Sequence, residues 1–214
     1  MMRFKHWPIL ALTLVGGVAG LAQTQSQMSG FLEEYPPLSP LEGVPNTVFW
    51  RNPDIEKKYR AVLVEPAELF LDPKSPYKGI NVDAFKIVAD TLRDLVATQI
   101  AEAHPIVVEP GPGVLRIRIA LSNVYLKKGA SFDWYQAVGP RSAARMRVAV
   151  GRNVSLVRAI LEIEGSDSET GRRLGFVASQ SGQESAHSGS WVDLVKRLDQ
   201  LSGPTQMTFA FLFE

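Results

Sequence analysis

The most conspicuous candidate for chemistry in this sequence is the glycine-rich segment Glu109-Pro-Gly-Pro-Gly113. A glycine-rich loop can bind phosphate when it opens onto the amino terminus of a helix, whose free backbone amides are the donors. Here the apolar alternation of a strand follows the loop, and its two prolines have no N–H to donate. The segment therefore favours a tight turn or bulge over a nucleotide site.

Serine and histidine come close together in the polar segment Ser185–Ser190, which contains His187. A serine activated by a histidine would make a hydrolytic site. None of these serines stands in the Gly-x-Ser-x-Gly pattern that places a nucleophile on a strand-to-helix turn. A hydrolase that uses this loop with His187 is therefore kept as the alternative function.

Metal and cofactor chemistry is thinly supplied. The chain has three histidines and no cysteine, which excludes a disulfide framework, a thiolate nucleophile and any cysteine-based zinc site. The carboxylate pairs Glu33-Glu34 and Glu162/Glu164 fall on linker or strand faces, and we interpret them as solvated surface. The sequence predicts no catalytic residue, no metal and no cofactor.

Positive charge is concentrated between residues 110 and 161. This stretch has nine basic residues and a single acid, Asp133, although the whole chain has 23 basic and 22 acidic residues. Arginine forks bind carboxylate and phosphate oxygens, and large aromatic residues are common at contact surfaces. We predict a partner-binding surface from three arginines and three aromatic residues of the expected loop between strands: Arg141, Arg145, Arg147, Phe132, Trp134 and Tyr135.

An equally weighted alternative is that these basic residues have no binding role. Arg116 and Arg118 alternate with apolar residues and can form the solvent-exposed face of a strand. The other arginines can pair with acids elsewhere in the chain. The net charge of +1 points to no nucleic-acid partner.

The amino terminus has the pattern of a secretory signal peptide. Arg3 and Lys5 precede an uncharged apolar run that ends at Ala22, and Gly20 and Ala22 fit the small-residue positions before a cleavage site. A membrane-spanning helix needs about 20 apolar residues, and this run is shorter. We expect cleavage after Ala22 and no transmembrane span in the mature chain.

The expected domains are a signal peptide (1–22), a Pro/Gln/Ser-rich linker (23–47) and one folded domain (48–214). Composition agrees with one ordinary domain, since 45% of the 214 residues are hydrophobic and 21% are charged. Within the linker, Phe31, Leu32, Tyr35 and Leu38 can pack against the domain. Without cysteine there is no lipobox, so we expect no lipid anchor.

Apolar patterns predict the elements of the domain. Three-and-four spacing indicates a helix over 82–103 with Asn81 as its N-cap, and a second helix over about 190–201. A hairpin turn is expected over 166–171, where Gly171 can take a positive φ. Strands are expected over 61–64, 69–71, 106–108, 114–121, 154–163, 174–179 and 207–213. This order predicts an α+β fold, a mostly antiparallel sheet with two helices packed on one face.

Several segments together resemble the bacterial domain-of-unknown-function family 3313. They are residues 29–35, the Asn52-Pro53-Asp54 turn, residues 59–66, Pro110–Arg118 and Asp167–Gly171, and the resemblance covers about residues 29–201. It implies a small exported protein, since most members look like lipoproteins of the Gram-negative envelope, and it brings no catalytic residues. Those relatives usually have a lipobox cysteine, which this chain lacks.

The function expected from the sequence is that of a non-enzymatic exported protein of the cell envelope or periplasm, acting as a binding or accessory module. Its expected partner is an envelope protein, an anionic envelope polymer or a lipid headgroup. The alternative is a periplasmic hydrolase that uses Ser185–Ser190 and His187.

Overall fold

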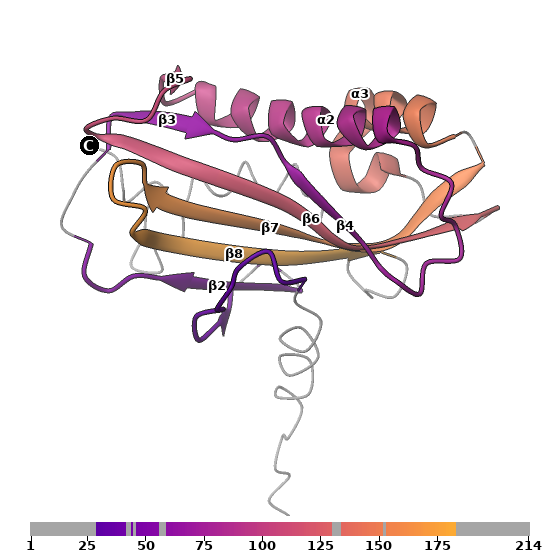
Figure 1. Cartoon of the computed structure of the whole chain (residues 1–214), viewed down its shortest axis with the longest axis horizontal. Coiled ribbons are helices and arrows are strands. Elements are labelled where there is room, and N and C mark those ends of the chain that lie inside the picture. The colour runs from indigo at the N-terminus through magenta and orange to yellow at the C-terminus, as the bar shows by residue number, and fades with distance from the viewer. Residues whose placement is uncertain are drawn as a thin grey trace, which may run out of the picture.

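The protein is described by a computed structural model, which covers residues 29–41, 44, 46–55, 59–129, 134–151 and 153–182. These residues form an eight-stranded mixed sheet and two helices, α2 and α3 (Figure 1). The strands are β1 (Ser39–Pro40), β2 (Thr47–Arg51), β3 (Ala61–Val64), β4 (Glu68–Leu71), β5 (Ile106–Val107), β6 (Val114–Lys128), β7 (Val154–Asp167) and β8 (Arg173–Gly182). The predicted α+β class and mostly antiparallel sheet are confirmed.

The sheet has the order β1-β2-β8-β7-β6-β3-β5, with β4 also paired to β6. Its long central strands β6, β7 and β8 pair antiparallel to one another. Strands β3 and β4 pair in parallel with β6, and β5 pairs in parallel with β3. The parallel part arises because helix α2 connects β4 to β5, and a crossover of that kind returns the chain in the same direction. The parallel edge therefore lies beside α2.

Strand β6 is longer than the alternation of apolar residues predicts. The pattern ends at Leu121, but the strand continues to Lys128 across a shift in its pairing with β7 between Ser122 and Leu126. Asn123 has a φ of 49° there, as expected at a bulge, where an extra residue interrupts the two-residue period. Beyond the bulge the side chains of Val124 and Leu126 return to the core.

The β7–β8 hairpin confirms the predicted turn. Gly171 has a φ of 71°, a conformation that costs glycine little because it has no Cβ. Asp167 fixes the turn, since its Oδ1 accepts hydrogen bonds from the backbone N–H groups of Glu169 (3.1 Å) and Thr170 (2.9 Å). Its Oδ2 accepts one from the buried Tyr59 hydroxyl at 2.8 Å.

Helix α2 (Val82–Ala101) confirms the predicted helix and its cap. The side chain of Asn81 accepts a hydrogen bond from the Ala84 amide at 2.8 Å, which satisfies one of the free amides at the helix start. Leu92 and Val96 are buried, as the three-and-four spacing requires. The helix contacts β3, β4 and β5 and lies beside α3.

The prediction of a loop between β6 and β7 is wrong, because residues 134–150 form helix α3 (Trp134–Val150). A kink at Gly139, whose φ is 75°, divides the helix just before Pro140. Proline is favoured in the first turn of a helix, so the Gly-Pro pair begins a second helical segment rather than a loop. Behind it, Ala143, Met146 and Val150 are buried at helical spacing.

Two apolar clusters hold the fold together. The larger one joins buried residues of α2 and α3 to alternate residues of β3, β6 and β7, and Figure 1 shows the two helices above the strands. The second cluster joins Phe31 and Leu32 to Ala120, Ile160 and Phe176. We call residues 29–41, which supply Phe31 and Leu32, the strap, because this part of the predicted linker packs onto the sheet.

Two predicted elements lie outside the described residues: the helix over 190–201 and the strand over 207–213.

Candidate functional site

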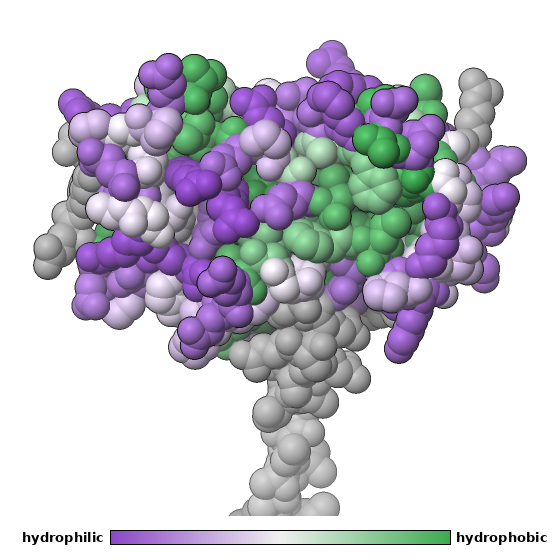
Figure 2. Space-filling model, viewed as in Figure 1, coloured by the Kyte–Doolittle hydropathy of each residue, from purple (hydrophilic) through white to green (hydrophobic). Residues whose placement is uncertain are grey.

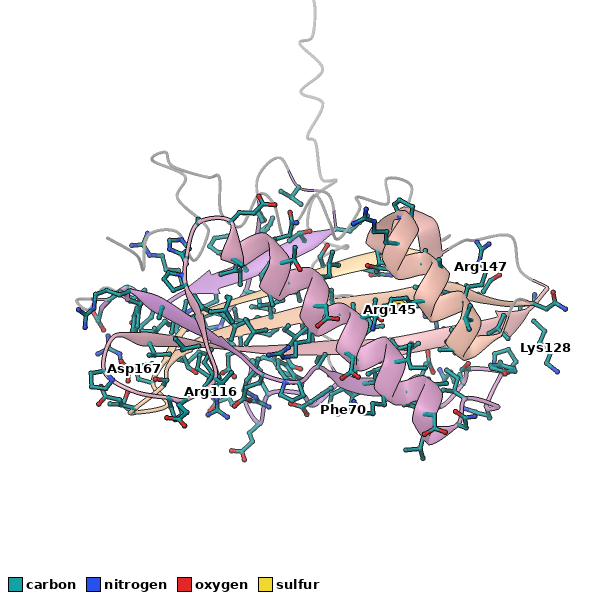
Figure 3. All side chains as sticks on the ribbon, turned by 90° about the horizontal axis from the view of Figure 1, so that it is seen from above. Phe70, Arg116, Lys128, Arg145, Arg147 and Asp167 are labelled. Atoms are coloured by element: carbon teal, nitrogen blue, oxygen red, sulfur yellow. The ribbon has the colours of Figure 1, made fainter. Side chains whose placement is uncertain are left out.

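The three arginines of the predicted binding surface all belong to α3, but they do not form one cluster. Arg141 and Arg145 are exposed and lie one turn apart. Arg147 follows Arg145 by two positions, about 200° around the helix, and Figure 3 shows these two residues on different sides of α3. Arg145 faces α2, where its Nη1 lies 3.1 Å from the Asp94 Oδ2. An exposed pair of this kind contributes little stability.

Val148 extends the side of α3 that presents Arg141 and Arg145. Positions 141, 145 and 148 repeat at the spacing that places residues along one stripe of a helix. Val148 is 78% exposed, so it adds an exposed apolar side chain to this side of the helix. The stripe therefore combines two cations with one exposed apolar side chain.

The aromatic members of the predicted surface cannot be placed beside these arginines. Phe132 lies outside the described residues, as do the side chains of Trp134 and Tyr135, although both residues belong to the first segment of α3. Ser185–Ser190 and His187, which carry the alternative hydrolase, also lie outside the described part of the chain. The hydrolase stays a prediction.

Several other basic residues of the 110–161 stretch pair with acids, as the alternative interpretation expects. The Arg116 Nη2 lies 2.6 Å from the Glu65 Oε1, and the Arg158 Nη2 lies 2.7 Å from the Asp72 Oδ2. Arg118 lies between two acids and contacts Glu68 at 2.9 Å and Glu164 at 3.0 Å. The excess positive charge on this stretch is therefore partly neutralised by carboxylates of other elements.

The interpretation of Glu162 and Glu164 as solvated surface is wrong. Glu162 is 0% exposed and Glu164 is 6% exposed, because the strap covers the face of β7 on which both side chains lie. Glu164 is compensated by Arg118 and by Arg173, whose Nε lies 2.6 Å from its Oε1. Alternation along β7 places these residues on the face opposite Leu161 and Ile163, but it does not show that a second layer covers that face.

Glu162 is held by three hydroxyl groups, two from the strap and one from β6. It accepts hydrogen bonds from Ser29 at 2.8 Å, from Tyr35 at 2.7 Å and from Ser122 of β6. Burial and the bond to this carboxylate raise the pKa of the Tyr35 phenol to about 12. A buried carboxylate needs such donors, because an unpaired one would be strongly destabilising. The cluster ties the strap to the centre of the sheet.

A second candidate site is a cavity of about 720 Å³ beside the parallel edge of the sheet. Its lining includes Glu65 and Pro66 after β3, Asp90 and Arg93 of α2, and Arg116 of β6. None of these residues belongs to a sequence motif that predicts a binding site. They come from distant parts of the chain, and only the crossover through α2 brings them together.

The glycine-rich segment 109–113 forms another wall of this cavity through Pro110. As predicted, it is a turn that leads into β6, and Gly113 has a φ of 72°. Ser168 holds the turn, since its Oγ donates to the Gly111 carbonyl at 3.0 Å and accepts from the Gly111 amide at 3.1 Å. A loop anchored in this way is a fixed wall of the cavity.

The described residues contain no group of three histidine or carboxylate side chains arranged to hold a metal ion. Neither described helix is long and apolar enough to cross a membrane.

Figure 2 shows that hydrophobic residues gather in the middle of one face of the molecule, where β4 runs in Figure 1.

Comparison with known proteins agrees with the resemblance seen in the sequence. The model of the family described as "Protein of unknown function (DUF3313)" matches residues 27–202, which is most of the chain. No curated protein matches the sequence.

Three solved structures are distantly similar to this chain. The PelC dodecamer from Paraburkholderia phytofirmans has a TM-score of 0.38 and 8% identity, covering 71% of this chain and 92% of that chain. A point variant of the same protein has a TM-score of 0.31 and 14% identity, with 75% and 96% covered. A PDZ domain protein from Parabacteroides distasonis has a TM-score of 0.26 and 11% identity, with 62% and 30% covered.

Proposed function

The chain belongs to the DUF3313 family of proteins of unknown function, and we propose that it is a non-enzymatic exported protein of the cell envelope that binds an anionic partner. The amino-terminal pattern ending at Ala22 supports export. The observation that carries the binding proposal is the stripe on α3, where exposed Arg141 and Arg145 stand in line with exposed Val148. Arginine forks bind phosphate oxygens, and the valine suits the apolar margin of a lipid headgroup layer.

The proposal includes an arrangement in which both helices cover one face of the sheet and the strap covers the other. It is supported by the two apolar clusters, because residues of α2 and α3 share one cluster and residues of the strap belong to the other. Such an arrangement leaves the outer side of the helix pair exposed, and there Arg141, Val148 and Arg145, which also contacts Asp94, can meet a partner. The strap joins the body to the segment that follows the signal peptide.

Co-sedimentation of the mature chain with lipid vesicles tests this proposal. Phosphatidylglycerol vesicles should bind the protein at low salt, and phosphatidylcholine vesicles should not. Binding should weaken as salt rises, because screening shortens the range of the attraction to about 8 Å at physiological ionic strength. Replacing Arg141, Arg145 and Arg147 together by glutamine should abolish binding without lowering the melting temperature.

Position on α3 provides a matched control. The double variant Arg141→Gln/Arg145→Gln should lose most of the binding, whereas Arg147→Gln, on another side of the helix, should retain it. Binding of the triple variant equal to that of the parent protein would show that the arginines are only surface.

A further inference from the structure

The cavity beside β3 has one guanidinium that is poorly neutralised. The two carboxylates that line the cavity are already paired with cations, since Glu65 lies 2.6 Å from Arg116 and Asp90 lies 2.7 Å from Lys86. Within the described part of the chain, the ion pairing of Arg93 consists of a 3.9 Å contact with Asp94. The positive charge of Arg93 is therefore the one in this cavity that a ligand can best match.

The backbone fixes the Arg93 side chain at the cavity wall. Its Nε donates a hydrogen bond to the Val64 carbonyl at 3.1 Å, at the end of β3. The Val64 carbonyl lies one residue beyond the last pair between β3 and β5. The bond from Arg93 satisfies this carbonyl at the end of the strand. The terminal nitrogens of Arg93 remain for a ligand, and a planar guanidinium binds a carboxylate through two parallel hydrogen bonds.

Part of the lining is apolar. Leu63, Pro66, Val108 and Pro110 line the cavity, and Val108 is 82% exposed. The volume of about 720 Å³ lies within the range of small-molecule sites, and the lining is about evenly divided between apolar residues and polar or charged ones. Glu65 and Asp90 would repel a ligand with several negative charges. A ligand with one carboxylate and an apolar body can place the carboxylate at Arg93 and its apolar part against the apolar lining.

From this arrangement we propose that the cavity binds a monocarboxylate with an apolar body, whose carboxylate contacts Arg93 and whose apolar part lies against Val108, Pro110 and Pro66. A free organic acid and the carboxy-terminal end of a peptide share this chemistry. Asp94 contacts both Arg93 and Arg145 of the α3 stripe, but the two proposals concern different ligands and are tested by separate titrations, so either can fail without the other.

A nuclear magnetic resonance titration of the mature protein with three probes tests the proposal. N-acetylvaline mimics a peptide terminus, hexanoate is an acid without amide groups, and N-acetylvalinamide lacks the carboxylate. The two acids should shift the amide resonances around residues 108–111 and Ser168, and the amide should bind at least tenfold more weakly. Preference for N-acetylvaline would identify a peptide terminus, and equal or tighter binding of hexanoate a free acid. Equal binding of N-acetylvalinamide would overturn the proposal.

Variants keep this test separate from folding. Arg93→Gln should weaken binding of the acids at least tenfold, but it also removes the bond to the Val64 carbonyl. Val108→Glu alters an exposed position and places a negative charge at the cavity, so it should weaken binding at an unchanged melting temperature. Val108→Gln should bind nearly as the parent does. Val82→Glu, at an equally exposed valine at the start of α2, should have no effect. Equal affinity of Val108→Glu and Val108→Gln would overturn the proposal.

Discussion

The Tyr35 hydroxyl donates a 2.7 Å hydrogen bond to the Glu162 carboxylate, across 127 positions of sequence. Tyr35 belongs to the proline-rich strap, and Glu162 lies at 0% exposure in the middle of β7. The Tyr35 ring also packs edge-on against Phe176 of β8, with 5.5 Å between ring centroids. Through this one side chain the strap packs against the sheet and also donates a hydrogen bond to a buried carboxylate. The strap is therefore a second layer of the domain.

We predict that Tyr35→Phe destabilises the protein by about 1–3 kcal/mol, the cost of leaving a buried polar group without one of its partners. The ring contact with Phe176 remains, so the loss reports the hydroxyl alone. Urea unfolding measures the change. Tyr77→Phe is the control, because the hydrogen bond from the Tyr77 hydroxyl to the Val150 carbonyl is long, at 3.4 Å, and its loss should matter less.

Alkaline pH should weaken the protein through the same phenol. The pKa of Tyr35 is about 12 in the folded chain and about 10 when unfolded. A raised pKa contributes stability that is fully present below pH 10 and is lost as the pH rises toward 12. Burial and the bond to Asp167 also raise the pKa of Tyr59, so Tyr35→Phe should reduce this loss without removing it. An identical pH profile for the variant would contradict the assignment.

Packing of α2 provides a third prediction. Leu92 is 0% exposed, and truncating a buried leucine costs about 2–5 kcal/mol. Leu92→Ala should lower the free energy of unfolding in urea by that amount. Ile87→Ala on the same helix should cost clearly less, since Ile87 is 37% exposed. Equal losses would mean that the helix packs through another face.

A fourth prediction concerns the amino terminus and follows from its sequence. Cleavage after Ala22 should give a mature chain that begins at Gln23. Intact-mass measurement of protein from the exported fraction checks this, with total cell protein as the comparison. A mass that retains residues 1–22 would contradict export as a mature periplasmic chain.

Local patterns were enough to predict much of the fold. Helix α2 with its Asn81 cap and the hairpin with Gly171 depend on contacts between residues near in sequence, and both are confirmed. Helix α3 was missed because Gly139-Pro140 interrupts its periodicity, although the buried spacing of Ala143, Met146 and Val150 is helical. A Gly-Pro pair can end one helix and begin another.

The buried carboxylates were beyond local patterns for a different reason. Whether Glu162 and Glu164 meet water depends on a strap more than 120 positions away, and the strap is identified only by its own few aromatic and aliphatic residues. The arginines show the same limit, since charge counts cannot tell the paired Arg116 and Arg158 from the exposed Arg141. Arg93 was missed because a single cation on a helix has no distinguishing motif.

Acid pH should weaken the protein through Asp72, the last prediction. Burial alone would raise the pKa of this carboxyl, but the Lys74 backbone amide, at 2.7 Å, and Arg158, at 2.7 Å, outweigh burial and lower it. A lowered pKa contributes stability that is present above about pH 4 and is lost as the pH falls through the folded-state value. Asp72→Asn should therefore destabilise the protein by about 1–3 kcal/mol at neutral pH, and the difference from the parent should shrink below pH 4.

Asp90→Asn is the matched control for Asp72→Asn. Asp90 also accepts a 2.7 Å contact from a cation, but its side chain and that of Lys86 are 44% and 72% exposed, against 11% and 23% for Asp72 and Arg158. Water screens an exposed pair, whose contribution is about 0–1 kcal/mol. Urea unfolding of both variants from pH 7 down to pH 3 measures the two effects. If Asp72→Asn cost no more than Asp90→Asn, burial would not be what strengthens the pair with Arg158.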